Sequence, residues 1–251
     1  ATTDDQVYGG YTAEHPISSA AVDETAGIVL THDGKLISAL YSSASGGHTA
    51  DNEEAFNSNA VAYLRGVPDA ERGEALEHVP SMEVFRAHGN PRSLRNTREA
   101  DFESDWSSFH RWTFEWSNAQ ITSVISAFAG QPVGQVHAIN VLSRGPSGRV
   151  TAIEYVTENG TFTHARDAIR SSLKFFNANG VATNLPSTLF FIEPVIDKHT
   201  GELEGFRVDG GGFGHGVGMA QTGAVGMAQK NHTYDEILLH YYRDVELTTA
   251  Y

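Results

Sequence analysis

The spacing of apolar residues along the chain predicts short helices between short strands. Apolar residues recur at positions 121, 124, 125 and 128, the interval of one helical face. Ser117 and Gln120 form a capping-box sequence before them and Gly130 follows, so we predict an amphipathic helix over 117–130. A second capping-box sequence, Thr233 to Glu236, predicts a C-terminal amphipathic helix through Tyr242.

Runs rich in β-branched and apolar residues predict antiparallel hairpins between these helices. Asp33-Gly34 is a two-residue turn signal between a strand over 27–32 and another over 35–42. Ser147-Gly148-Arg149 is interpreted as a hairpin turn, with Arg149 pairing locally. Further strands are expected at 133–143, 149–157, 161–163, 188–196 and 203–208, with a short helix over 164–173. This order predicts the α+β fold class, with antiparallel β-hairpins and a few short packed helices forming two lobes around a groove.

The pattern weakens from about residue 66 to residue 115, where charges and prolines are scattered. We interpret this stretch as a long surface excursion with short helical pieces. Trp106, Trp112 and Trp116 follow closely. We favour a packing role that anchors the excursion to the core, and the alternative is stacking on sugar rings.

A run of glycines on one parity separates the last predicted hairpin from the next helix. Glycine occupies every even position from 210 to 218 in DGGGFGHGVG, which starts at Asp209. If this run is extended, one face carries no side chains and admits a close approach of backbone or of a flat ligand. A helix with a stripe of small residues is expected to start near Gly218. The run matches neither the phosphate-binding GxxxxGK[ST] pattern nor GxGxxG.

The composition and net charge of the chain exclude several classes of protein and partner. The 251 residues are 40% hydrophobic, so a globular chain is expected. The net charge of −14 argues against nucleic acid as a partner, because no basic patch meets the phosphates. No apolar run approaches the length of a membrane span, and cysteine is absent.

The stretch GFGHGVGMAQTGA at 212–224, followed by GMAQKNHTYDEILLHYY, resembles the signature of the stage II sporulation protein D and amidase-enhancer LytB (SpoIID/LytB) family. Other stretches agree in order along nearly the whole chain, weakly between 69 and 115. They are QVYGG at 6–10, TAGIVL at 25–30, SGGHT at 45–49, AYLRGV at 62–67, SGRV at 147–150 and PSTLF at 186–190.

The resemblance implies a single SpoIID/LytB-like domain over 1–251 that acts outside the cytoplasm on bacterial peptidoglycan. Well-studied members are lytic transglycosylases, and others are enhancers of a wall amidase, so peptidoglycan glycan strands and a wall amidase are the implied partners. In the transglycosylases a glutamate protonates the glycosidic oxygen. The family carries it on an alanine-rich helix before the QVYGG stretch, and this chain starts five residues before Gln6, so we expect the general acid outside this chain. Glu53 and Glu54 are the nearest substitutes, but we interpret them as a solvated loop or helix start.

No metal or cofactor is expected. Some family members hold zinc with histidine and cysteine near the QVY and SGG stretches, whereas this chain has Asp5 and Ser45 at or near those places. Neither an HExxH motif nor a clear His-x₃-His pair occurs among the 12 histidines. For His48 and His215 hydrogen bonding is therefore favoured over metal binding.

The two stretches of small residues are the predicted substrate site. We expect them to line one groove in which a glycan lies against bare backbone, with His215 and Gln221 bonding to sugar hydroxyl or acetamido groups. The alternative is that the glycines only permit tight packing. Three functions stay open: a lytic transglycosylase whose acid lies elsewhere, a wall-binding or amidase-stimulating module, and a structural surface protein. The predicted site residues are Ser45, Gly46, Gly47, His48, Thr49, Gly214, His215, Gly216, Gly218, Met219 and Gln221.

Overall fold

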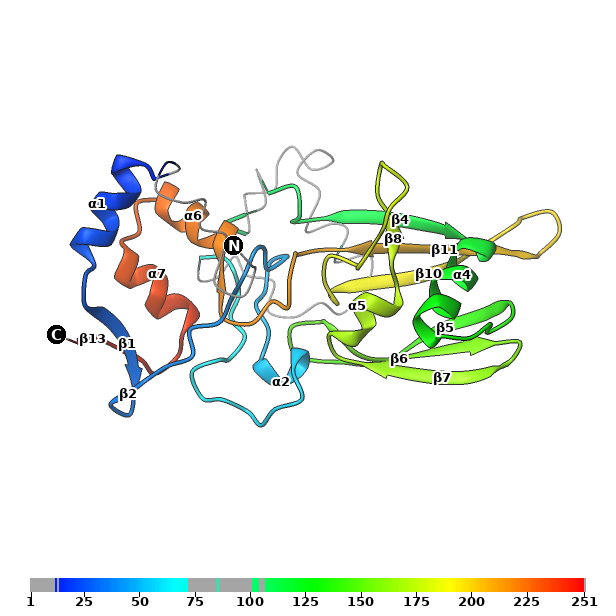
Figure 1. The fold of residues 1–251 in the computed structure, drawn as a ribbon, viewed down its shortest axis with the longest axis horizontal. Helices are drawn as coiled ribbons and strands as arrows, with labels where there is room; N and C mark the ends of the chain where they lie inside the picture. The colour runs from blue at the N-terminus through cyan, green and yellow to red at the C-terminus, as the bar shows by residue number, and fades with distance from the viewer. Residues whose placement is uncertain (1–11, 13, 72–84, 86–100, 104–106, 251) are drawn as a thin grey trace. The chain divides into compact units, whose positions relative to one another are not determined.

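The structure is a computed structural model that describes residues 12, 14–71, 85, 101–103 and 107–250 (Figure 1). The chain forms two compact units. One unit comprises the described residues up to Ile37 together with those from Val245, and the other comprises those from Ser38 to Asp244. The expectation of a single domain stays a prediction.

The smaller unit is a three-stranded antiparallel sheet with one helix. Strand β1 (Ile28–His32) lies between β13 (Glu246–Thr249) and β2 (Lys35–Leu36). Asp33 and Gly34 both have positive φ angles, 50° and 71°, which confirms the predicted two-residue turn. The second strand was expected to reach residue 42 but ends at Leu36. Helix α1 (Pro16–Glu24) precedes the sheet.

The larger unit is built on two antiparallel sheets of three strands each. One has the order β10 (Phe190–Ile196), β11 (Leu203–Gly210), β4 (Trp112–Ser117). The other has the order β5 (Val136–Arg144), β6 (Val150–Thr157), β7 (Gly160–Ala165). The hairpins predicted for these segments are confirmed, and with the helices they confirm the α+β class.

Helices α4 (Asn118–Ala129) and α5 (Ala168–Ser172) share one hydrophobic core with both sheets (Figure 1). The predicted caps of α4 are confirmed: Ser117 and Gln120 form the capping box, and Gly130 ends the helix in the left-handed conformation. Helix α5 is shorter than expected because residues 164 and 165 pair with β6 as part of β7. The core joins residues from both helices and both sheets, among them Trp116, Ile121, Ile125, Val136, Ile153, Tyr155, Ile169, Leu173, Phe190 and Phe206.

Packing explains the tryptophans that the structure describes. Trp112 and Trp116 are buried in the core, and their indole N–H groups donate to the carbonyls of Gly212 and Lys174. The packing role is thus confirmed for these two, whereas Trp106 lies outside the described residues.

The remaining elements of the larger unit carry the glycine-rich motifs. Parallel strands β3 (Tyr41–Ser42) and β12 (Met219–Ala220) pair directly before α6 (Gln221–Gln229). The capping box of Thr233 and Glu236 starts α7 (Tyr234–Tyr241) as predicted. The described part of this unit also contains α2 (Asn52–Ala55) and the short hairpin of β8 (Phe175–Phe176) and β9 (Ala182–Thr183).

The described residues of the stretch from 66 to 115 include exposed ones, such as Phe109 and Glu115, and buried charged ones. Asp69, Asp101, Glu103 and His110 are all buried. Their burial could not be inferred from the local pattern, because residues distant in sequence supply the partners described below.

Candidate functional site

The structure brings the two small-residue stretches together, as expected, but through direct contact. Ala44 and Phe213 exchange backbone hydrogen bonds of 3.1 and 2.9 Å, and the Ala50 N–H donates to the Gly216 carbonyl at 2.8 Å. Their own backbones therefore fill the space between them, and Ser45, Gly46, Gly47 and Thr49 are buried.

The glycine run is not an extended strand. Strand β11 ends at Gly210, and Gly212, Gly214, Gly216 and Gly218 have φ angles of 80°, 106°, 82° and 73°. Other residues rarely adopt these values, which is a first reason for glycine here. The prediction of one bare face is wrong, because the backbone does not alternate as a strand does.

Close packing is the second reason for glycine. A Cβ atom on Gly46 would lie 2.8 Å from backbone atoms of Gly211 and Gly212, and one on Gly218 would lie 1.9 Å from the Leu40 carbonyl oxygen. At Gly216 the added atom would lie 2.3 Å from the Arg149 guanidinium. The structure thus supports the packing alternative for these positions.

Arg149 ties the motifs together from inside the unit. It is fully buried, and its guanidinium donates to the carbonyls of Ser45 at 2.7 Å and His48 at 2.8 Å. Burial lowers the pKa of Arg149, while the charges of Glu54 and Glu103 oppose the change. The turn at 145–148 is confirmed, but the expectation of local pairing is wrong, because the partners lie about a hundred residues away in sequence.

Glu54 is a buried structural acid and does not lie in a solvated loop. It is 4% exposed, accepts hydrogen bonds from the Ser147 hydroxyl at 2.6 Å and the Asp51 N–H at 2.9 Å, and caps α2. Burial raises the pKa of Glu54, against the effect of the Ser147 hydrogen bond. Glu53 pairs with Arg65 at 2.5 Å on the outside.

A buried acidic network that the sequence did not reveal supports the SGG stretch. Glu103 accepts hydrogen bonds from the N–H groups of Gly46 at 2.6 Å and Ser45 at 3.2 Å, and from the Thr222 hydroxyl. His110 lies 3.3 Å from both Glu103 and Asp101. The network therefore joins the SGG stretch to α6 and to the described part of the 66–115 stretch.

Asp69 forms the second half of this network. Its carboxylate accepts from the Ser45 hydroxyl at 2.7 Å and from the Tyr241 hydroxyl. Burial, together with the charge of Glu103, raises the pKa of Asp69 well above its usual value. For Glu103, burial alone would raise the pKa, but hydrogen bonds from His110 and Thr222 hold it below the usual value. The N–H groups of Gly46 and Ser45 and the His110 ring at Glu103 favour the charged form of this carboxylate.

The small-residue stripe of α6 makes room for the same network. A Cβ atom on Gly223 would lie 2.1 Å from the Asp69 carboxylate, and one on Gly226 would lie 1.9 Å from the Phe102 carbonyl oxygen. The predicted close packing of this helix is thus confirmed, and its contacts are now identified.

Both histidines of the predicted site are engaged with backbone. The Nδ1 of His48 is hydrogen-bonded to the Thr49 carbonyl at 2.6 Å, and burial lowers the pKa of His48. The Nδ1 of His215 accepts from the Val217 N–H at 3.0 Å, and the ring is also bonded to the Tyr41 backbone. Burial lowers the pKa of His215 to about 4, so the ring is neutral at pH 7.

What the motif leaves at the surface is aromatic. Phe213, within the glycine run, is 38% exposed and stacks on Phe109, which is 39% exposed. Their ring centroids are 4.4 Å apart and their planes differ by 21°. The ring of His215 packs on Phe56 at 5.2 Å, and Gln221 is exposed at the start of α6. The stacked pair presents flat aromatic surface to the solvent beside the glycine run. The sequence analysis missed this pair because Phe109 lies in the weakly patterned stretch.

Two further features bear on the kind of site. No group of three or more histidine, aspartate or glutamate side chains in the described residues is placed to hold a metal ion. None of the helices described here has the length and apolar character that crossing a bilayer requires.

The motifs agree with what comparison with known proteins finds. A family model described as a domain of unknown function, DUF8618, matches residues 50–218, about two thirds of the chain. The chain belongs to this family. The DUF8618 match includes α2, both larger sheets and the whole glycine run from 210 to 218.

Curated relatives cover nearly all of the chain. It is similar to the amidase enhancer of Bacillus subtilis, with 27% identity over 99% of this chain and 35% of the relative. It is also similar to stage II sporulation protein D of Bacillus amyloliquefaciens, with 26% identity over 92% of this chain and 50% of the relative. An uncharacterized protein of Brachyspira hyodysenteriae shares 27% identity over 98% of this chain and 52% of its own length. The DUF8618 chain is thus related to the SpoIID/LytB family, and it spans between about a third and a half of the length of these relatives.

Proposed function

We propose that this chain is a glycan-binding module of a bacterial cell-wall protein that acts outside the cytoplasm on peptidoglycan strands. The names of the related amidase enhancer and sporulation proteins support a role at the cell wall. The observation that carries the proposal is the exposed stack of Phe109 and Phe213, held on the family's own glycine motif.

The buried and exposed halves of the motif have different tasks in this proposal. Ser45, Gly46, Gly47, His48 and Thr49, with Gly216 and Gly218, hold the backbone in place from within. The glycan contacts fall to the aromatic pair and to the predicted site residues that keep some exposure, which are Gly214, His215, Met219 and Gln221.

Stacking rather than ion pairing provides the affinity. A sugar ring offers an apolar face of C–H groups, and an aromatic ring offers a matching flat surface. The net charge of −14 gives no attraction to the carboxylates of muramic acid. Added salt is therefore expected not to weaken binding, unlike binding through ion pairs, because it screens the repulsion between the acidic chain and these carboxylates.

Pull-down with glycan strands freed of stem peptides tests the proposal. Replacing both Phe109 and Phe213 with alanine is expected to weaken retention at least tenfold. Leu239→Ala is the matched control, because it removes an apolar side chain that is 46% exposed on α7. Full retention by a folded double variant would contradict the proposal.

A second candidate function is stimulation of a cell-wall amidase. It is favoured by the relative named amidase enhancer, which matches 99% of this chain. Adding the chain to a purified wall amidase and following peptide release from intact peptidoglycan tests it. Stimulation that survives the Phe109 and Phe213 double substitution would favour direct contact with the amidase over glycan binding.

The last part of the proposal concerns cleavage of the glycan strand, which we do not expect from this chain alone. The resemblance implies transglycosylase chemistry with a general-acid glutamate expected outside this chain, and Glu54 is already bound by Ser147. The chain alone is therefore expected to release no anhydro-ended fragments from freed strands, as followed by mass spectrometry. Their release would show that the acid lies among these residues.

A further inference from the structure

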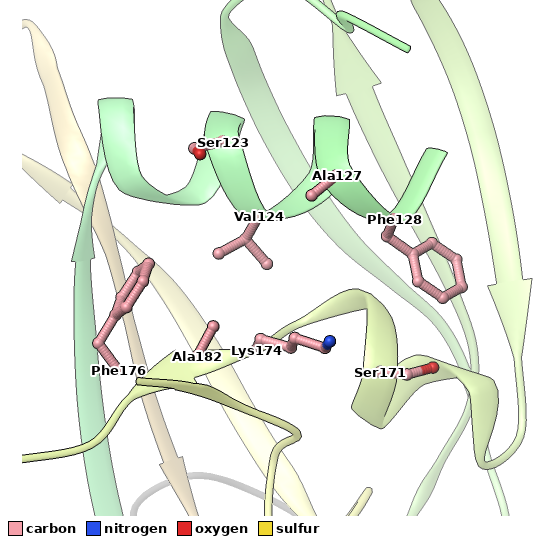
Figure 2. A pocket seen from close by; sticks show the side chains of 8 residues that line it. All are labelled: Ser123, Val124, Ala127, Phe128, Ser171, Lys174, Phe176 and Ala182. Carbon is pink, nitrogen blue, oxygen red and sulfur yellow. The ribbon is translucent and has the colours of Figure 1, made fainter. Parts of the chain in front are cut away.

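A cavity of about 360 Å³ lies in the larger unit between α4, the end of α5 and the β8–β9 hairpin (Figure 2). This volume is within the range of small-molecule sites. Figure 2 shows Val124 pointing from α4 into the space, with Lys174 on the opposite side. The complete lining is Ser123, Val124, Ala127, Phe128, Ser171, Lys174, Phe176 and Ala182.

The lining is apolar at its centre and aromatic at its ends. Phe128 and Phe176 stand at opposite ends of the space, and each keeps more than a third of its surface exposed. Ala127 and Ala182 keep the space open, because their side chains are too small to fill it. Exposed aromatic rings around a hollow commonly mark a binding surface.

The framework of the cavity is fixed by contacts on its other side. The ring of Phe175 stacks on Phe114 with centroids 3.8 Å apart, and the Trp116 indole holds the Lys174 carbonyl at 2.8 Å. Lys174 and Phe176 flank Phe175, so they project toward the cavity while Phe175 faces the core. The site is therefore formed before any ligand binds.

One cation and two hydroxyls supply its polar groups. In the described part of the chain Lys174 has no ion-pair partner, whereas the neighbouring Arg170 is paired with Asp167 at 3.1 Å. Ser171 donates its hydroxyl proton to the Ala168 carbonyl, so its oxygen lone pairs remain available. Ser123 provides a second hydroxyl at the rim. The single ammonium balances the one negative charge of a carboxylate, whereas a phosphate would bring about two charges to a lining that contains no arginine.

We propose that this cavity binds a small amphipathic carboxylate, with an aromatic or branched apolar group between Phe128 and Phe176 and its carboxylate at Lys174. This site is separate from the glycine motif and from the aromatic pair formed by Phe109 and Phe213. Its occupation does not depend on the proposed glycan binding.

Titration with N-acetylphenylalanine, followed by NMR of the amide signals, tests the proposal. A ligand of this size is expected to saturate with a Kd on the order of a millimolar or lower. The shifts should concentrate on α4 and on the segment after α5. The neutral probe N-acetylphenylalaninamide is expected to bind at least fivefold more weakly, because it lacks the charge that Lys174 meets.

Two variants with matched controls complete the test. Lys174→Met keeps an aliphatic side chain but removes the charge, and it should abolish the preference for the acid over the amide. The control Lys198→Met, in the exposed β10–β11 turn, should retain that preference. Ala127→Trp should fill the cavity and weaken the acid at least tenfold, whereas Ala129→Trp on the other side of α4 should not. Equal binding of acid and amide to the native chain, or an unchanged preference in Lys174→Met, would overturn the proposal.

Discussion

Replacing His215 with glutamine is expected to remove part of the acid sensitivity of this protein. The ring is partly buried between Phe56 and the glycine run, and burial lowers its pKa to about 4. A glutamine oxygen can still accept the Val217 N–H bond that Nδ1 accepts now. The substitution therefore removes the titration while keeping the hydrogen bond.

The sign and size of the effect follow from the two pKa values. Above pH 6.5 the ring is neutral in the folded and the unfolded chain, so it makes no difference to the free energy of unfolding. Between pH 6.5 and 4 the unfolded chain takes up a proton that the folded chain excludes, and stability falls as the pH falls. A folded pKa of about 4 makes this loss about 2 kcal/mol at pH 5, an upper value because the side chain is partly exposed.

Urea unfolding of both proteins at pH 7.5 and pH 5 measures the loss directly. Between pH 7.5 and pH 5, the free energy of unfolding of the native protein is expected to fall by about 1–2 kcal/mol more than that of the His215→Gln variant. His199→Gln in the exposed turn after β10 controls for the loss of a histidine as such. Equal losses in the native and His215→Gln proteins would refute the assignment of a buried neutral ring.

Two further substitutions test the interior of the motif. Gly216→Ala places a methyl group against the Arg149 guanidinium at a φ of 82°, and we expect it to lower the free energy of unfolding by about 3 kcal/mol or more. The control Gly180→Ala has a similar φ of 73° but open space around the added methyl group, and it should lower the free energy of unfolding by about 1 kcal/mol. The urea midpoints of the two variants measure this difference, and equal midpoints would contradict the close contact between Gly216 and Arg149. Glu103→Gln replaces the charged acceptor of two backbone N–H bonds and should lower stability by about 1–3 kcal/mol, while Glu202→Gln on the exposed turn should change it little. A Glu103 variant as stable as native protein would show that the network is not a stabilising one.

Local signals predicted the regular elements of this fold well. The capping boxes at 117–120 and 233–236 and the Asp33-Gly34 turn are short-range features, and each stands where the sequence placed it. The two central hairpins are also correct, because alternation along a strand depends on the core that it faces. The ends of elements were predicted less well. Helix α5 was expected to start at residue 164, but residues 164 and 165 pair with β6 as part of β7.

The interior of the motif could not be predicted in the same way. The glycines at 46 and 216 were visible in the sequence, but not the neighbours that exclude a side chain there, because Gly211 and Arg149 are distant in the chain. The buried acids at 69 and 103 gave no local signal, since isolated carboxylates in a polar stretch usually lie in solvent. Only the fold brings Ser45, Thr222 and Tyr241 around them.

Backbone amide NMR during titration with freed glycan strands tests the glycan-binding proposal most directly. We expect the largest shift changes at Phe213, Gly214 and Phe109, with little change at the buried Ser45 and Thr49. Saturable binding whose shifts fall elsewhere in the chain and spare Phe109 and Phe213 would contradict the assignment of the aromatic pair as the glycan contact.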